Sequence, residues 1–234
     1  MAVVYIHIPK CGGTTLRYLL AAQYPASRIY PVPLHPGAHI SDEPFPVQYT
    51  TDPLPGIHEH GQKYDLVMGI FDWRAISPND RVMVMLRNPV EHLISTYNYL
   101  GRSKDRGAIN EWTVVGKLGL EGWIESEHVR HHLNFMTCCL SSFEQPDLET
   151  AKANLSQCAV VGLVEQFDES IARIEKAFGY QFERPIPRHN VATAPPVVRT
   201  IIRDRIAELR PDDMALYEHA VKLFAPPKTR SRKQ

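Results

Sequence analysis

Short runs of β-branched and other apolar residues recur along the chain, and a helix-like pattern follows each of them. The four runs span residues 3–8, 66–71, 81–87 and 159–164. Apolar runs of this length and composition are typical of buried strands. Strands that alternate with helices predict a parallel sheet that is covered on both faces. The sequence therefore predicts an α/β fold with a central parallel sheet flanked by helices.

The segments between and after these runs predict helices and one long irregular stretch. We expect helices over residues 16–24, 89–102, 121–140, 148–155, 168–178, 197–209 and 212–224. Residues 25–63 lack periodicity, and eight of the 19 prolines lie between Pro25 and Pro55, which predicts a long irregular excursion of the kind that is usually functional or mobile. No repeat or second hydrophobic unit is visible, so we expect one domain over 1–224 and a basic C-terminal tail over 225–234.

The charge balance and the cysteine content exclude several classes of protein. The 26 Lys and Arg residues match 26 Asp and Glu residues, so the chain lacks the excess positive charge of a general nucleic-acid binder. No run of about 18 apolar residues occurs, so no transmembrane helix is predicted. Four cysteines in 234 residues do not form a disulfide framework. Because no signal peptide precedes the first strand, we expect a soluble cytoplasmic protein.

A glycine-rich loop follows the first apolar run and leads into the first expected helix. Adjacent glycines let backbone N–H groups turn toward a ligand, and a helix N-terminus adds partial positive charge. A lysine and two threonines add a point charge and hydroxyl donors. The residues expected to hold an anion are Lys10, Cys11, Gly12, Gly13, Thr14 and Thr15. The alternative is a tight turn with a solvated lysine. A Walker A loop is excluded, because its lysine follows the glycines.

A second strand-to-helix junction follows the run that ends at Arg87. Carboxyl ends of parallel strands meet at one edge of a sheet, so Arg87 is expected at the same edge as Lys10. Ser95 lies about two helical turns further, on the face that also carries His92 and Tyr99. An arginine fork and a hydroxyl can hold a second phosphate. The alternative is an arginine that caps a helix and a serine that faces solvent.

As a pair, the two junctions resemble the nucleotide-binding motifs of sulfotransferases that use 3′-phosphoadenosine 5′-phosphosulfate (PAPS). The stretch from Pro9 to Leu16 is similar to the loop that binds the 5′-phosphosulfate in this family. Arg87-x-Pro89 with Ser95-x-Tyr97 is similar to its 3′-phosphate motif. The order of segments looks like that of the carbohydrate-type branch, which includes heparan sulfate 2-O-sulfotransferase and bacterial relatives.

The resemblance implies a P-loop-kinase-like three-layer sandwich and sulfuryl transfer from PAPS to a hydroxyl or amine. The acceptor would be a saccharide, a lipid or a small metabolite, and adenosine 3′,5′-bisphosphate (PAP) would be the other product. It implies that Lys10 stabilises the leaving oxygen and that backbone amides from Cys11 to Thr15 hold the 5′-phosphate. Arg87 and Ser95 would hold the 3′-phosphate. No metal is expected, and the missing membrane anchor favours a bacterial-type cytoplasmic enzyme.

One position departs from the family pattern and leaves the catalytic base open. Relatives usually carry a catalytic histidine directly after the glycine of the second strand, where this chain has Ile70. Asp72 would share a strand face with Ile70, and His58 or His60 lies in the long excursion. The third alternative is that the chain has no base. His92 stands where relatives often have arginine, which predicts altered nucleotide binding.

Other readings of the chain remain open at this point. A P-loop-like nucleotide kinase would require ATP and magnesium, and a non-catalytic nucleotide-binding protein of the same fold would bind without turnover. Three histidines between 128 and 132 and the cysteine pair 138–139 lack the spacing of a metal motif, so we predict no metal site. Trp112 and Trp123 either frame the acceptor pocket or fill the core.

Overall fold

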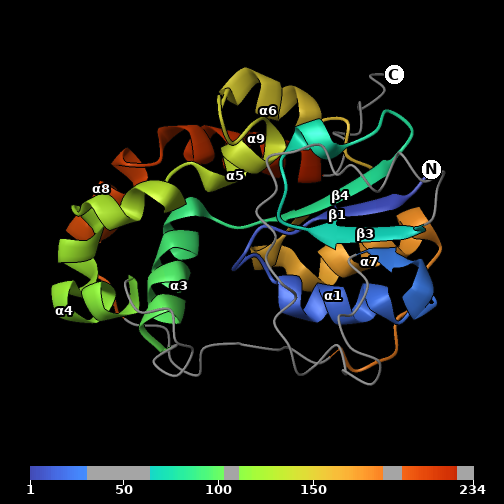
Figure 1. Cartoon of the computed structure of the whole chain (residues 1–234), viewed down its shortest axis with the longest axis horizontal. Helices are drawn as coiled ribbons and strands as arrows, with labels where there is room; N and C mark the ends of the chain where they lie inside the picture. The colour runs from blue at the N-terminus through green and yellow to red at the C-terminus, as the bar shows by residue number, and fades with distance from the viewer. Residues whose placement is uncertain (31–63, 103–110, 187–196, 226–234) are drawn as a thin grey trace, which may run out of the picture.

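The computed structural model describes residues 1–30, 64–102, 111–186 and 197–225, and its central feature is one parallel sheet (Figure 1). The strands are β1 (Val3–Ile6), β2 (Ile29–Tyr30), β3 (Leu66–Gly69), β4 (Arg81–Leu86) and β5 (Val160–Leu163). Their order in the sheet is β2-β3-β1-β4-β5, and every pairing is parallel. The predicted α/β fold with a central parallel sheet is therefore confirmed.

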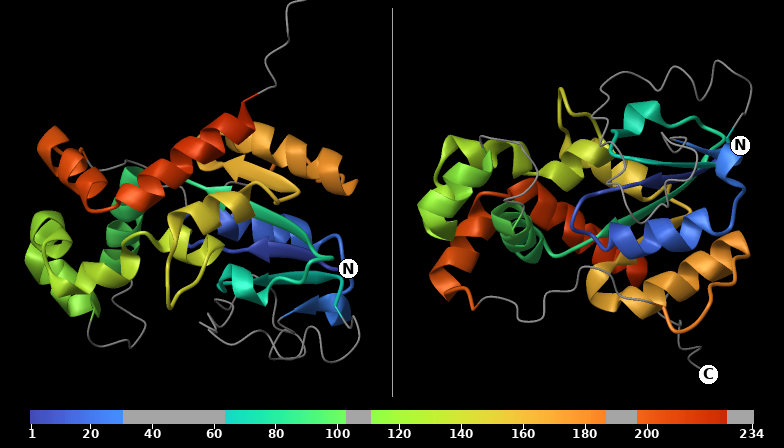
Figure 2. Two further views of the ribbon diagram at one scale, coloured as in Figure 1. Left: turned by 90° about the horizontal axis from the view of Figure 1, so that it is seen from above. Right: turned by 60° about the horizontal axis from the view of Figure 1, so that its bottom comes forward.

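Helices cover both faces of this sheet. The helices α1 (Gly13–Ala21) and α7 (Phe167–Phe178) lie below the strands in Figure 1, and Figure 2 shows the same layering from two further directions. Above the strands lie α5 (Phe135–Leu140), α6 (Leu148–Leu155) and α9 (Pro211–Phe224). Because both faces are covered, successive side chains on β1 and β4 are buried whichever face they point to, as in Ile6 and Met85, and only the first residue of each strand is partly exposed. The arrangement agrees with the three-layer sandwich implied by the resemblance.

A second hydrophobic cluster lies beside the sheet, in a lobe of helices that the sequence pattern does not separate. The lobe contains α3 (Pro89–Arg102), α4 (Glu111–Ile124) and α8 (Thr200–Glu208), and it occupies the left side of Figure 1. Trp123 is fully buried in this cluster, so it fills the core and does not frame an open pocket. Since α3 continues directly from β4, the lobe is joined to the edge of the sheet where the two expected junctions lie.

The prediction of one helix over residues 121–140 is wrong. Helix α4 ends at Ile124, a 3-10 helix η3 (Glu127–His132) follows, and α5 begins only at Phe135. Asn134, with left-handed backbone at φ +48°, separates η3 from α5, and Gly119 at φ +66° kinks α4 just before the predicted start. The composition stays helix-like across these breaks, which is why periodicity does not reveal them. Within the described ranges, no helix is long and apolar enough to cross a membrane.

Candidate functional site

The structure brings the two predicted junctions together at one edge of the sheet. Strands β1 and β4 are neighbours, with Ile6 opposite Val84. The guanidinium of Arg87, just after β4, donates a hydrogen bond from Nη1 to the carbonyl oxygen of Lys10 at 3.2 Å. The loop after β1 and the segment before α3 therefore form a single site.

The loop adopts the left-handed backbone at two of its residues. Lys10 has φ +65°, which costs a non-glycine residue about 1–2 kcal/mol, and Gly12 has φ +74°. Gly12 is the N-cap of α1, which has no side-chain cap and no acidic residue in its first turn. A nine-residue helix thus begins at the loop without a built-in negative group to balance its N-terminus.

The close approach of His7, a residue that sequence reasoning missed, explains why the second glycine of the loop has no side chain. His7 follows β1, and a Cβ placed on Gly13 would lie 2.4 Å from its Cε1 atom. Any larger residue at position 13 would therefore displace the imidazole. Burial, followed by the charges of Arg17 and Lys10, lowers the pKa of His7 to about 3, so the ring is neutral. The adjacent glycines were the only sequence signal for this close approach.

The ammonium group of Lys10 points toward α3. Its Nζ atom lies 4.2 Å from the ring centroid of Tyr99, in a cation–π contact. Tyr99 follows the half-buried Ser95 by one helical turn, so both side chains share the face of α3 that Lys10 approaches. Lys10, Arg87 and Ser95 were all predicted for the site, whereas Tyr99 was only placed on the same helical face.

Cys11 is a packing residue of the loop. It is completely buried, and burial raises the pKa of its thiol far above the ordinary value, so the thiol stays protonated. Its N–H group donates to the carbonyl of Ile8 at 3.3 Å. The stretch of amides that can face a phosphate therefore begins at Gly12, one residue later than the resemblance implied.

Asp72 is engaged in local structure in a way that argues against its role as a base. Strand β3 ends at Gly69, so residue 72 lies beyond the alternating strand face on which its candidacy rested. Its carboxylate caps the 3-10 helix η2 (Trp73–Ala75) by accepting from the Arg74 N–H at 3.0 Å. It also pairs with the Arg74 guanidinium at 2.8 Å and accepts from the Phe143 N–H at 3.0 Å. We therefore do not propose Asp72 as the base.

Replacing Asp72 with alanine is expected to lower the free energy of unfolding by about 1–3 kcal/mol, because buried donors lose their acceptor. Nucleotide affinity should not change. Urea unfolding and calorimetry on the same variant measure the two quantities. A variant with wild-type stability but no turnover would instead restore Asp72 as a candidate base.

Neither Ile70, at the position where relatives have histidine, nor the two histidines of the long excursion supplies a base among the described residues. Ile70 is buried, with 4% of its surface exposed, and cannot accept a proton. His58 and His60 lie outside the described residues. His92, expected to alter nucleotide binding, is buried, and its Nε2 atom lies 2.9 Å from the carbonyl oxygen of Pro9. It contacts the backbone of the loop and does not face a ligand.

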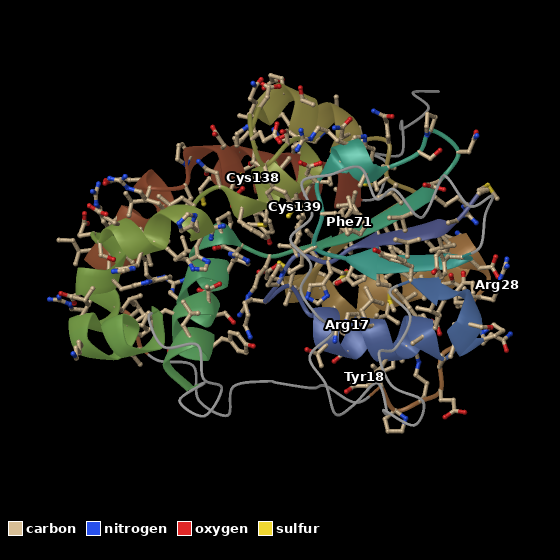
Figure 3. All side chains as sticks on the ribbon, viewed as in Figure 1. Arg17, Tyr18, Arg28, Phe71, Cys138 and Cys139 are labelled. Carbon is tan, nitrogen blue, oxygen red and sulfur yellow. The ribbon has the colours of Figure 1, made fainter. Side chains whose placement is uncertain are left out.

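The remaining histidines and cysteines do not assemble a metal site in the part of the chain that the structure describes. No group of three His, Cys, Asp or Glu side chains could hold an ion there. Cys138 and Cys139 lie on α5, on the opposite side of the sheet from Arg17 and Tyr18 of α1 (Figure 3). Burial raises the pKa of Cys138 to about 11 and holds that of Cys139 well above its ordinary value, so both thiols are protonated, and Cys139 is part of the core.

Comparison with known proteins adds no assignment. No family model matches the chain, and the curated proteins contain no match. The functional argument therefore depends on the motifs at the two junctions and on the geometry that unites them.

Proposed function

We propose that the protein is a PAPS-dependent sulfotransferase that transfers a sulfuryl group to a hydroxyl or amine of a saccharide, lipid or small-metabolite acceptor. The observation that supports this most is the hydrogen bond between Arg87 and the Lys10 carbonyl. It unites two motifs, 77 residues apart in sequence, whose pairing resembles the donor site of this family. The parallel sheet is the fold that such a site requires.

The residues of the loop would bind the 5′ end of the donor. The N–H groups from Gly12 onward and the N-terminus of α1 would hold the 5′-phosphate. The ammonium of Lys10 would turn from Tyr99 to the bridging oxygen. An exposed cation–π contact is worth only about 0.5–1 kcal/mol, so this movement costs little. Lys10 would thereby stabilise the charge that develops as the sulfur–oxygen bond breaks.

The second junction would bind the 3′-phosphate. Arg87 uses Nη1 for the Lys10 carbonyl and has further N–H groups in its fork for a phosphate. Ser95 lies two turns into α3 and would add a hydroxyl donor. The acceptor oxygen would attack sulfur as the bond to PAP breaks, and its proton would pass to a base that the described residues do not assign. Positioning and charge stabilisation would carry the catalysis.

A second candidate is a non-catalytic nucleotide-binding protein of the same fold. The buried Ile70 and the engaged Asp72 favour it, because Ile70 has no basic group and the Asp72 carboxylate is already bound to Arg74 and Phe143. A nucleotide kinase is less well supported, since Thr14 and Thr15 stand where a Walker A loop has its lysine after the glycines.

Calorimetry with PAP, followed by a PAPS turnover assay over a panel of acceptors, separates these functions. We expect PAP to bind the intact protein without magnesium, and at least one acceptor to be sulfated. The absence of any binding would contradict the sulfotransferase proposal. Binding without turnover on any acceptor would support the non-catalytic function, and activity only with ATP and magnesium would support a kinase.

A further inference from the structure

A buried chain of polar contacts connects the start of α9 with the loop that carries Lys10. Asp213 pairs with Nη2 of Arg210, and Nη1 of Arg210 lies 3.0 Å from Nδ1 of His92. The other ring nitrogen of His92, Nε2, lies 2.9 Å from the carbonyl oxygen of Pro9. Arg210 and Asp213 are completely buried and His92 is 3% exposed, so solvent does not screen these contacts.

The chemistry of arginine fixes the hydrogen positions along this chain. A guanidinium only donates, so Nδ1 of His92 accepts from Arg210, and Nε2 carries the hydrogen and donates to the Pro9 carbonyl. His92 is therefore neutral. Burial first, and then the charge of Arg210, holds the pKa of His92 well below its ordinary value, which agrees with this arrangement.

Neighbouring helices hold the Asp213 end of this chain of polar contacts in place. Asp213 accepts from the N–H group of Thr137 at 2.8 Å and from its hydroxyl at 2.9 Å, both on α5. Arg210 also donates to the carbonyl of Pro89 at 2.6 Å. These bonds hold Asp213 and Arg210 in place. Arg210 in turn fixes the orientation of the His92 imidazole.

The fixed imidazole of His92 contacts the loop next to Lys10, the residue with left-handed backbone. His92 holds the carbonyl of Pro9, and Arg87 holds the carbonyl of the next residue, Lys10, whose backbone is left-handed. Two consecutive peptide groups are thus fixed from the β4–α3 side. These two bonds fix the backbone from which the side chain of Lys10 extends.

We propose that His92 and Arg210 are positioning residues of the candidate nucleotide site. Through the bond to Pro9 they hold the loop in the form in which Lys10 and the following amides can meet a phosphate. The nature of the ligand rests on the proposed function, whereas the effect on the loop backbone does not.

A pair of variants at position 92 tests the proposal. Gln in H92Q can place an acceptor toward Arg210 and a donor toward Pro9, as the imidazole does. The shorter Asn in H92N reaches Arg210 and keeps that buried charge satisfied, but it does not reach Pro9. We expect H92N to bind PAP at least tenfold more weakly than H92Q, and H92Q to stay within about threefold of the wild type, by calorimetry.

A second readout and a matched control separate positioning from stability. Amide hydrogen exchange at residues 10–13 should be faster in H92N than in H92Q. The control is N154A, which removes the buried hydrogen bond from Asn154 to the Leu140 carbonyl, away from the loop, and should lower stability without changing PAP affinity.

The outcomes are distinguishable from a failure of the proposed function. If the wild type does not bind PAP, the proposed function fails, and hydrogen exchange alone decides whether His92 holds the loop. If H92N and H92Q show equal exchange in the loop and equal PAP affinity, the positioning role is overturned. If N154A weakens PAP binding as much as H92N does, the effect is one of general stability and the proposal also fails.

Discussion

Alanine at Lys10 or at Arg87 is expected to weaken the binding of PAP more than tenfold in each case. Each side chain would make charge-assisted hydrogen bonds to a phosphate, which are worth about 1.5–3 kcal/mol, and tenfold corresponds to about 1.4 kcal/mol. The loss at Arg87 should be the larger, because R87A also removes the bond that holds the Lys10 carbonyl. R87K should be intermediate, since it keeps the charge but loses the fork.

Calorimetric titration of the variants with PAP measures these losses. The matched control is R205A, which removes the same charge from α8, where Arg205 pairs with Glu125 at 2.7 Å and Glu208 at 3.1 Å. Its affinity for PAP should equal that of the wild type. If R205A and R87A weaken binding equally, the overall charge of the protein and not a local site would determine affinity, which would contradict the proposed site.

The strands could be predicted from sequence because both of their faces are buried. The segment Arg81–Leu86 reads as one continuous apolar run, and its observed bounds differ from the prediction by one residue. Helix α3 was predicted with its observed bounds, because Asn88 caps it by accepting from the N–H groups of Val90 and Glu91. The two-residue strand β2 was missed, since two residues show no periodicity.

The candidate site could be predicted only where local chemistry defines it. Lys10 and Arg87 lie at strand ends, and the topology of a parallel sheet places such ends together. The contact of His7 with Gly13 and the bond from Arg210 to His92 depend on packing between distant segments, in the latter case 118 residues apart. No pattern in the sequence encodes them. The candidacy of Asp72 depended on a strand pattern that continues past Gly69, where the strand itself ends, and the contacts of its carboxylate argue against that role.

The free energy of unfolding is expected to fall by about 2 kcal/mol through the half-buried His7 when the pH is lowered from 7 to 5, and to fall further through the buried His92. Burial is the main cause that lowers the pKa of His7, to about 3, and that of His92 well below 6.5. The His7 ring therefore stays neutral in the folded protein at pH 5, and His92 takes up a proton less readily than in the unfolded chain, where both rings titrate near pH 6.5. The unfolded state binds more protons, so this stability is complete above pH 6.5 and is lost as the pH falls, toward pH 3 in the case of His7.

Urea unfolding at the two pH values measures this loss, and glutamine variants assign it. H7Q should reduce the loss between pH 7 and pH 5 by about 2 kcal/mol, and H92Q should also reduce it, because glutamine does not titrate. H131Q at the exposed His131 is the control and should leave the loss unchanged. Equal losses in the wild type and in both buried-site variants would mean that these imidazoles are charged in the folded protein. A charged His92 cannot accept from Arg210, so the same result would also break the chain of contacts that reaches Pro9.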